Sequence, residues 1–111
     1  MDSKQAVTQD VLDEIVRRIV AAVRPLRIIL FGSAARGQTG ADSDLDLLIV
    51  VRDGCHTRQV AQHLYSQLRG IGCAKDLVVV QESDVRKHGD NPYLIIHDAL
   101  RDGKELYRAV E

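Results

Sequence analysis

Acidic residues crowd together directly before a strongly apolar run of the chain. In "DSDLDLLIV" Asp42, Asp44 and Asp46 are spaced two apart, and Asp76 opens a later apolar run, "DLVVV". Because side chains alternate along a strand, Asp44 and Asp46 should share one face where a strand begins. Three carboxylates within about 5 Å would repel by roughly 3 kcal/mol per pair at an effective dielectric constant of 20. Such a group either keeps protons or surrounds a cation, and oxygen ligands suit Mg²⁺.

A structural interpretation of the same acids is also open. Asp42 and Asp44 suit a turn, and Asp46 suits a solvated strand start. Asp-x-Asp is a weak motif by itself, and Asp76 alone is weaker. Asp42 is interpreted here as a loop acid.

A glycine-serine turn stands just upstream of the acids, in "GSAARG". Gly32 would let a ligand or another backbone approach closely, and Ser33 would begin a helical turn over residues 33–37 whose free N–H groups attract phosphate. An N-capping serine after a glycine turn is the alternative. A P-loop is excluded because Gln38 stands where that loop needs lysine. Arg36 either holds a triphosphate oxygen or pairs with one of the acids.

The surrounding pattern indicates helices and strands that would position these residues. An amphipathic helix is expected over the stripe from Val11 to Val23, capped by Thr8 or Asp10 and ended by Pro25. Further elements are expected as strands at residues 27–31, 45–51 and 76–80, helices at 58–68 and from Pro92 to Gly103, and an edge strand near 105–107. The mixed-charge segment 82–91 is expected to be a solvated face or loop.

Strands separated by helices indicate an α/β layer fold. The strands at 45–51 and 76–80 are joined by a helix, so they should run parallel with a right-handed crossover. Parallel pairing would bring Asp46 and Asp76 to the same edge of the sheet.

Composition limits the classes of protein that remain. With 111 residues the chain should form a single domain, 1–111, and a formal net charge of −1 argues against non-specific nucleic-acid binding. No signal segment or membrane span is visible, so a cytoplasmic location is expected, with Cys55 and Cys73 as unpaired thiols that are buried or half-buried. The histidines show no metal-ligand spacing.

The combined pattern resembles a known family. "GSAARG", followed by "DSDLDLLIV" and by "KDLVVV", is similar to the motif of the nucleotidyltransferase superfamily that includes DNA polymerase β, and most resembles its small stand-alone members, the minimal nucleotidyltransferases (MNT). The closing "ALRDGKELY" resembles the family's C-terminal helix and edge strand. The resemblance implies the nucleotidyltransferase fold, a small mixed β-sheet flanked by helices (α/β, α+β).

By that resemblance, Asp44, Asp46 and Asp76 would be catalytic and would bind two Mg²⁺ (or Mn²⁺) ions, while Gly32 and Ser33 would hold the phosphates of ATP. The implied reaction transfers a nucleoside monophosphate and releases pyrophosphate. Family members of this size are commonly partnered with a HEPN toxin, and some transfer AMP to a tyrosine of that toxin. The expected function is therefore a nucleotidyltransferase antitoxin.

Two other functions are kept open: an antitoxin that neutralises its partner by binding alone, and a stand-alone transferase acting on a small molecule. The sequence does not specify the nucleotide, the acceptor or the oligomeric state, and a homo-oligomer is compatible with it.

Overall fold

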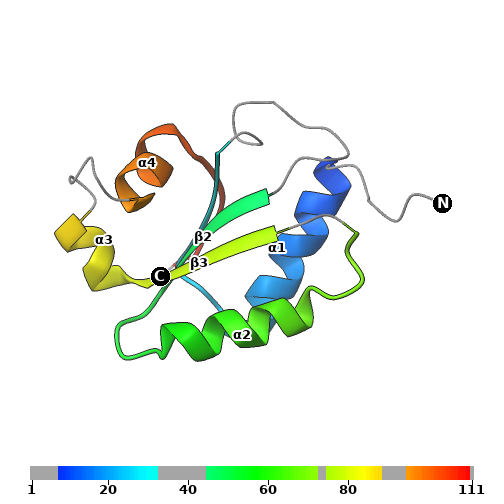
Figure 1. Cartoon of the computed structure of the whole chain (residues 1–111), viewed down its shortest axis with the longest axis horizontal. Helices are drawn as coiled ribbons and strands as arrows, with labels where there is room; N and C mark the ends of the chain where they lie inside the picture. The colour runs from blue at the N-terminus through cyan, green and yellow to red at the C-terminus, as the bar shows by residue number, and fades with distance from the viewer. Residues whose placement is uncertain (1–7, 33–44, 73–74, 89–94, 111) are drawn as a thin grey trace.

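The computed structural model describes residues 8–32, 45–72, 75–88 and 95–110 (Figure 1). In chain order its elements are α1 (Gln9–Val23), β1 (Arg27–Phe31), β2 (Leu45–Val51), α2 (Thr57–Gln67), β3 (Lys75–Gln81), α3 (Glu82–His88), α4 (Ile95–Asp102) and β4 (Lys104–Arg108). No helix in these ranges is long and apolar enough to cross a membrane.

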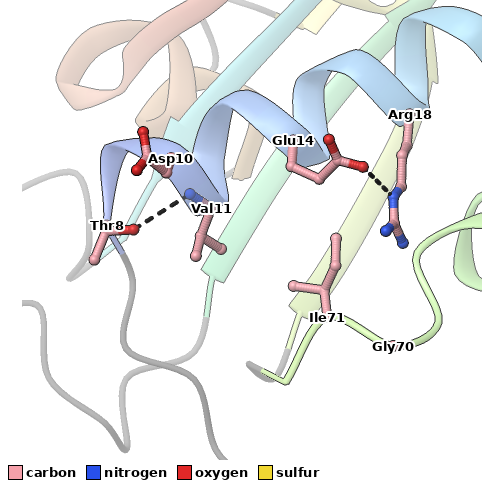
Figure 2. Close-up of a pocket in the computed structure, with 7 residues that line it drawn as sticks. All are labelled: Thr8, Asp10, Val11, Glu14, Arg18, Gly70 and Ile71. Carbon is pink, nitrogen blue, oxygen red and sulfur yellow. Dashed lines mark hydrogen bonds and ion pairs between the residues drawn. The ribbon is translucent and has the colours of Figure 1, made fainter.

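The first helix, α1, begins and ends at recognisable capping residues. The Thr8 hydroxyl accepts a hydrogen bond from the Val11 N–H at 3.3 Å, so Thr8 rather than Asp10 is the N-cap (Figure 2). At the other end Arg24 takes a left-handed conformation with φ 47°, and Pro25 follows it. The helix therefore ends just before Pro25, as the position of this proline in the sequence predicted.

The four strands form one mixed sheet in the order β3-β2-β1-β4. β1 is antiparallel to both β2 and β4, whereas β2 and β3 are parallel and are joined by α2. The predicted parallel pairing of the second and third strands is therefore confirmed. The expected mixed sheet flanked by helices is also confirmed, with β4 as one edge strand and β3 as the other.

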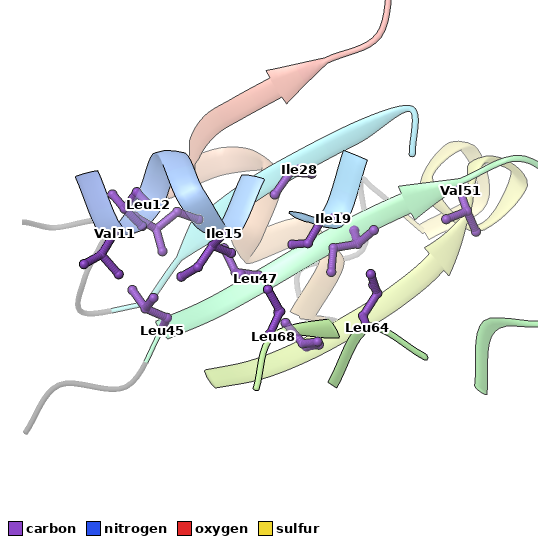
Figure 3. Close-up of a cluster of buried hydrophobic side chains, with 13 residues drawn as sticks. Val11, Leu12, Ile15, Ile19, Ile28, Leu45, Leu47, Val51, Leu64 and Leu68 are labelled. Atoms are coloured by element: carbon purple, nitrogen blue, oxygen red, sulfur yellow. The ribbon is translucent and has the colours of Figure 1, made fainter. Parts of the chain in front are cut away.

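Helices cover both faces of the sheet: α1 and α2 lie on one face, and α3 and α4 lie on the other (Figure 1). β2 contributes side chains to both faces. Leu45 and Leu47 pack under α1 and α2 (Figure 3). Ile49 belongs to the same cluster, whereas Leu48 and Val50 join the cluster on the α3 and α4 face. This two-sided burial explains why residues 45–51 read as a nearly continuous apolar run.

The described part of the segment expected to be a solvated face or loop forms helix α3, in which no residue is buried, so it is a solvated face and not a loop. Its first turn carries acids and its last turn carries basic residues, which suits the helix dipole. Asp53, in the turn after β2, accepts a hydrogen bond from the Ser83 N–H at 2.9 Å and thereby caps the helix. That cap comes from thirty residues upstream, so local sequence reasoning had no access to it. Residues 89–94, including the predicted helix start at Pro92, lie outside the described residues.

Candidate functional site

Asp46 and Asp76 face each other across neighbouring strands. They are register partners in the parallel pairing of β2 with β3. Partner residues on adjacent strands lie about 5 Å apart at Cα, and their side chains point to the same face of the sheet. Asp46 is half-buried and Asp76 is exposed. The structure therefore brings these two predicted site residues together.

The carboxylate pair lies on the α3 and α4 face of the sheet. Asp46 has the same parity along β2 as Leu48 and Val50, which belong to the hydrophobic cluster under α4. Asp76 has the same parity along β3 as Val78 and Val80, which pack in that cluster. The pair thus sits at the beginning of both strands, where this apolar layer gives way to solvent.

Gly32 lies directly against the carboxylate of Asp46. It follows the last residue of β1, Phe31, which is the antiparallel register partner of Asp46. Gly32 has φ +74°, and a Cβ added there would collide with Oδ2 of Asp46 and lie 3.3 Å from its Cγ. The sequence predicted a close approach at Gly32 but not its partner. In its present rotamer the Asp46 carboxylate occupies the space that a side chain at residue 32 would need, so a side chain there would require the carboxylate to rotate aside.

The remaining predicted site residues, Ser33, Arg36 and Asp44, lie outside the described residues. Their roles in phosphate and metal binding stay predictions. Gly32, the last described residue before that segment, lies against the Asp46 carboxylate, and Leu45, the first described residue after it, directly precedes Asp46 in β2.

The donor set fits a hard divalent cation. Two carboxylates on the same face of adjacent strands repel each other when both are ionised, and a cation held between them would offset that repulsion. Carboxylate oxygens that leave coordination positions open are the ligands that Mg²⁺ takes when it also binds substrate phosphate. Among the described residues no group of three or more His, Cys, Asp or Glu side chains could hold a metal ion. Asp46 and Asp76 are therefore the part of the candidate metal site that the described residues contain.

A cavity of about 390 Å³ lies on the opposite face of the sheet (Figure 2). Its lining comes from one side of α1 and the turn after α2: Thr8, Asp10, Val11, Glu14, Arg18, Gly70 and Ile71. The Arg18 guanidinium donates a hydrogen bond to the Glu14 carboxylate at 2.7 Å. Hydrogen bonds from Arg17, the larger cause, and from Arg18 lower the pKa of Glu14 to about 2. Arg18 also donates to the carbonyl of Arg69 at 3.0 Å. These contacts tie α1 to the α2 turn, and the cavity is separate from the carboxylate pair.

One contact near Asp76 has no counterpart in the sequence analysis. The hydroxyl of Tyr65, on α2, accepts a hydrogen bond from the backbone N–H of Leu77 at 2.9 Å. A lone tyrosine on the polar side of a helix gives no sequence signal for such a contact. Lys75, which strand alternation directs away from Asp76, donates to the carbonyl of Ile71 at 3.1 Å. The thiol of Cys55 is free and half-buried against the α1 and α2 core, as expected, whereas Cys73 lies outside the described residues.

The sheet topology and the sequence can be compared with those of known proteins. The family described as polymerase beta, nucleotidyltransferase, matches residues 14–111. The chain therefore belongs to the polymerase β nucleotidyltransferase family, and the predicted family is confirmed. No curated protein matches the chain in sequence.

Solved structures share the fold. A protein described as a nucleotidyltransferase, from Sulfolobus solfataricus, is 20% identical with a TM-score of 0.61, covering 89% of this chain and 78% of its own. A toxin-antitoxin structure with AMP-PNP is 22% identical with a TM-score of 0.56, covering 93% of this chain and 75% of its own. A MntA-HpeT toxin-antitoxin mutant, with two Asp-to-Glu changes two positions apart, is 19% identical with a TM-score of 0.56 and the same coverage.

Proposed function

We propose that this chain transfers AMP from ATP to a hydroxyl group of a partner protein, and that it acts as the antitoxin of a HEPN toxin by modifying a tyrosine of that toxin. The observation that carries the catalytic half of the proposal is the pairing of Asp46 with Asp76 on one face of the sheet, against Gly32. The antitoxin half is supported by the shared fold with two toxin-antitoxin structures, one of them with AMP-PNP.

In the proposed reaction the acceptor oxygen bonds to the α-phosphorus of ATP while the bond from that phosphorus to the β-phosphate oxygen breaks. Pyrophosphate leaves, and the hydroxyl proton passes to solvent. Asp44, Asp46 and Asp76 would hold two divalent metal ions, which supply positive charge to the entering and leaving oxygens. Gly32 and Ser33 would bind the β- and γ-phosphates, with Arg36 as an additional phosphate ligand.

The residues of this chain contribute mainly by position and charge. Asp46 is held between β1 and β3, against the Gly32 backbone, so its carboxylate has a fixed place. Asp76 is the more exposed acid and lies on an edge strand, so among the described residues it is the acid that an acceptor hydroxyl would reach more readily. This asymmetry favours Asp46 as the central ligand and Asp76 as the acid nearest the acceptor.

The test uses the chain co-purified with the HEPN protein, labelled ATP and Mg²⁺. We expect label from the α-phosphate to enter the HEPN protein, and Asp46→Asn to lower the rate about 100-fold or more, since it removes charge where the reaction develops it. Asp13→Asn is the matched control, because Asp13 is an exposed acid on α1. Complex formation should survive both substitutions.

Toxin neutralisation separates the proposal from its alternatives. If Asp46→Asn still binds the toxin but no longer neutralises it, catalysis is required. Neutralisation that survives Asp46→Asn unchanged would instead support an antitoxin that acts by binding alone. Label that enters a small molecule and never the protein would support the stand-alone transferase.

A further inference from the structure

The strand that carries Asp76 has one edge without a neighbouring strand. β3 is the outer strand of the sheet, and its hydrogen-bonding partner on the inner side is β2. Along the outer edge the Leu77 N–H donates to the hydroxyl of Tyr65 at 2.9 Å, and the Gln81 N–H donates to a carboxylate oxygen of Asp84 at 3.1 Å. Side chains therefore replace the missing strand at two points, one near each end of β3.

The Tyr65 hydroxyl contacts the peptide group that links Asp76 to Leu77. The Leu77 N–H belongs to the peptide plane that begins at the Cα of Asp76, so holding this N–H restrains the backbone that carries the carboxylate. Tyr65 is 44% exposed, so core packing does not account for its position. The Lys75 ammonium donates to the Ile71 carbonyl and so holds the turn before β3. That contact does not involve the Leu77 N–H, which donates to the Tyr65 hydroxyl.

We propose that Tyr65 is a positioning residue for Asp76: its hydroxyl oxygen holds the Leu77 amide and so fixes the start of β3 in register with β2. The inference rests on the proposed function, because it assigns Asp76 a part in metal and acceptor binding. Tyr65 itself does not touch the nucleotide. Its effect reaches the reaction through the place of one carboxylate.

The test substitution is Tyr65→Phe, which keeps the ring and removes only the acceptor oxygen. Two controls match it. Tyr107→Phe makes the same chemical change on β4, at the opposite edge of the sheet, and Asp84→Ala removes the other side-chain acceptor of β3, at the end far from Asp76.

The first readout is amide hydrogen exchange, which needs neither nucleotide nor partner. In Tyr65→Phe the Leu77 amide should exchange roughly 2- to 10-fold faster, as expected when one net hydrogen bond is lost. The Gln81 amide should keep its wild-type rate. Asp84→Ala should show the reverse pattern, and Tyr107→Phe should change neither amide.

The second readout is AMP transfer as a function of Mg²⁺ concentration. Tyr65→Phe should raise the half-saturating Mg²⁺ concentration and lower kcat several-fold while KM for ATP stays unchanged, and high Mg²⁺ should restore part of the rate. A merely structural role would lower the amount of active protein without moving the Mg²⁺ dependence. Asp84→Ala should retain the wild-type Mg²⁺ dependence.

The outcomes distinguish the inference from the proposed function. Unchanged exchange at Leu77 in Tyr65→Phe would overturn the inference whatever the reaction. Faster exchange with unaltered kcat and Mg²⁺ dependence would also overturn it, while leaving the transferase intact. A wild-type protein that transfers no nucleotide would overturn the proposed function and the inference with it.

Discussion

Replacing Gly32 by alanine should damage both the fold and the site. Two costs arise there. Gly32 has φ +74°, a left-handed conformation that costs a residue with a side chain about 1–2 kcal/mol. The new methyl group would in addition meet Oδ2 of Asp46, so the carboxylate would have to leave its place.

Gly54→Ala separates these two costs. Gly54 has φ +93°, yet a Cβ there meets nothing within 4 Å, so its alanine variant carries the backbone cost alone. The new methyl group at residue 32 must also push aside the end of the Asp46 side chain, which can rotate, so this second cost should lie near the lower end of the about 1–3 kcal/mol that overpacking a core costs. We therefore expect Gly54→Ala to lower the free energy of unfolding by about 1–2 kcal/mol and Gly32→Ala to lower it by about 2–3 kcal/mol.

Urea denaturation gives the two free energies, and the proposed AMP transfer to a partner protein gives the second comparison at a temperature where both variants are folded. Gly54→Ala should keep the wild-type rate per folded molecule, whereas Gly32→Ala should lose most of it because Asp46 is displaced. Equal destabilisation in the two variants, together with equal activity, would show that the carboxylate does not depend on the space at Gly32.

Other predictions concern the core, the acid response and the α3 cap. Ile15→Ala should lower the free energy of unfolding by about 2–5 kcal/mol, because the Ile15 side chain is 0% exposed in the core. In the same urea experiment Val110→Ala, at a 99% exposed position, should change the free energy of unfolding by no more than about 0.5 kcal/mol. The pKa of Glu14 is about 2 in the folded chain against an ordinary 4.5, so its stabilising contribution is present above pH 4.5 and is lost as the pH falls toward 2; Glu14→Gln should flatten the stability profile in that window, most clearly at low salt. Asp53→Ala should speed exchange of the Ser83 amide, since that N–H is the main cause that lowers the pKa of the Asp53 carboxyl, and unchanged exchange would refute the cap.

Local pattern was enough to predict the strands that carry the site. Residues 27–31 and 45–51 form strands with the expected bounds, and the parallel pairing of β2 with β3 followed from the helix between them. Burial on both faces of β2 is visible in the sequence as apolar residues at both parities. Asp46 and Asp76 could be placed at one edge because both stand where such a run begins.

Contacts between distant segments were beyond local pattern. Asp53 accepts from the Ser83 N–H at the start of the helix over Glu82–His88, and Tyr65 accepts from the Leu77 N–H at the outer edge of β3. Each is a single hydrogen bond between residues twelve or more apart, which no spacing rule marks. Gly32 was correctly singled out, but the group that fills the space beside it became evident only from the fold.

The register of β2 with β3 couples correct folding to the chemistry in an all-or-none manner. Shifting β3 by one residue would set Lys75 or Leu77 opposite Asp46, and the Asp76 side chain would turn to the α1 and α2 face of the sheet. An ammonium or isobutyl group would then stand where the proposed metal site has its second carboxylate, and the charge of Asp76 would be forced against the apolar layer. Misaligned molecules would thus be both unstable and inert, so length changes in the turn between α2 and β3 should be tolerated only when they leave this alignment intact.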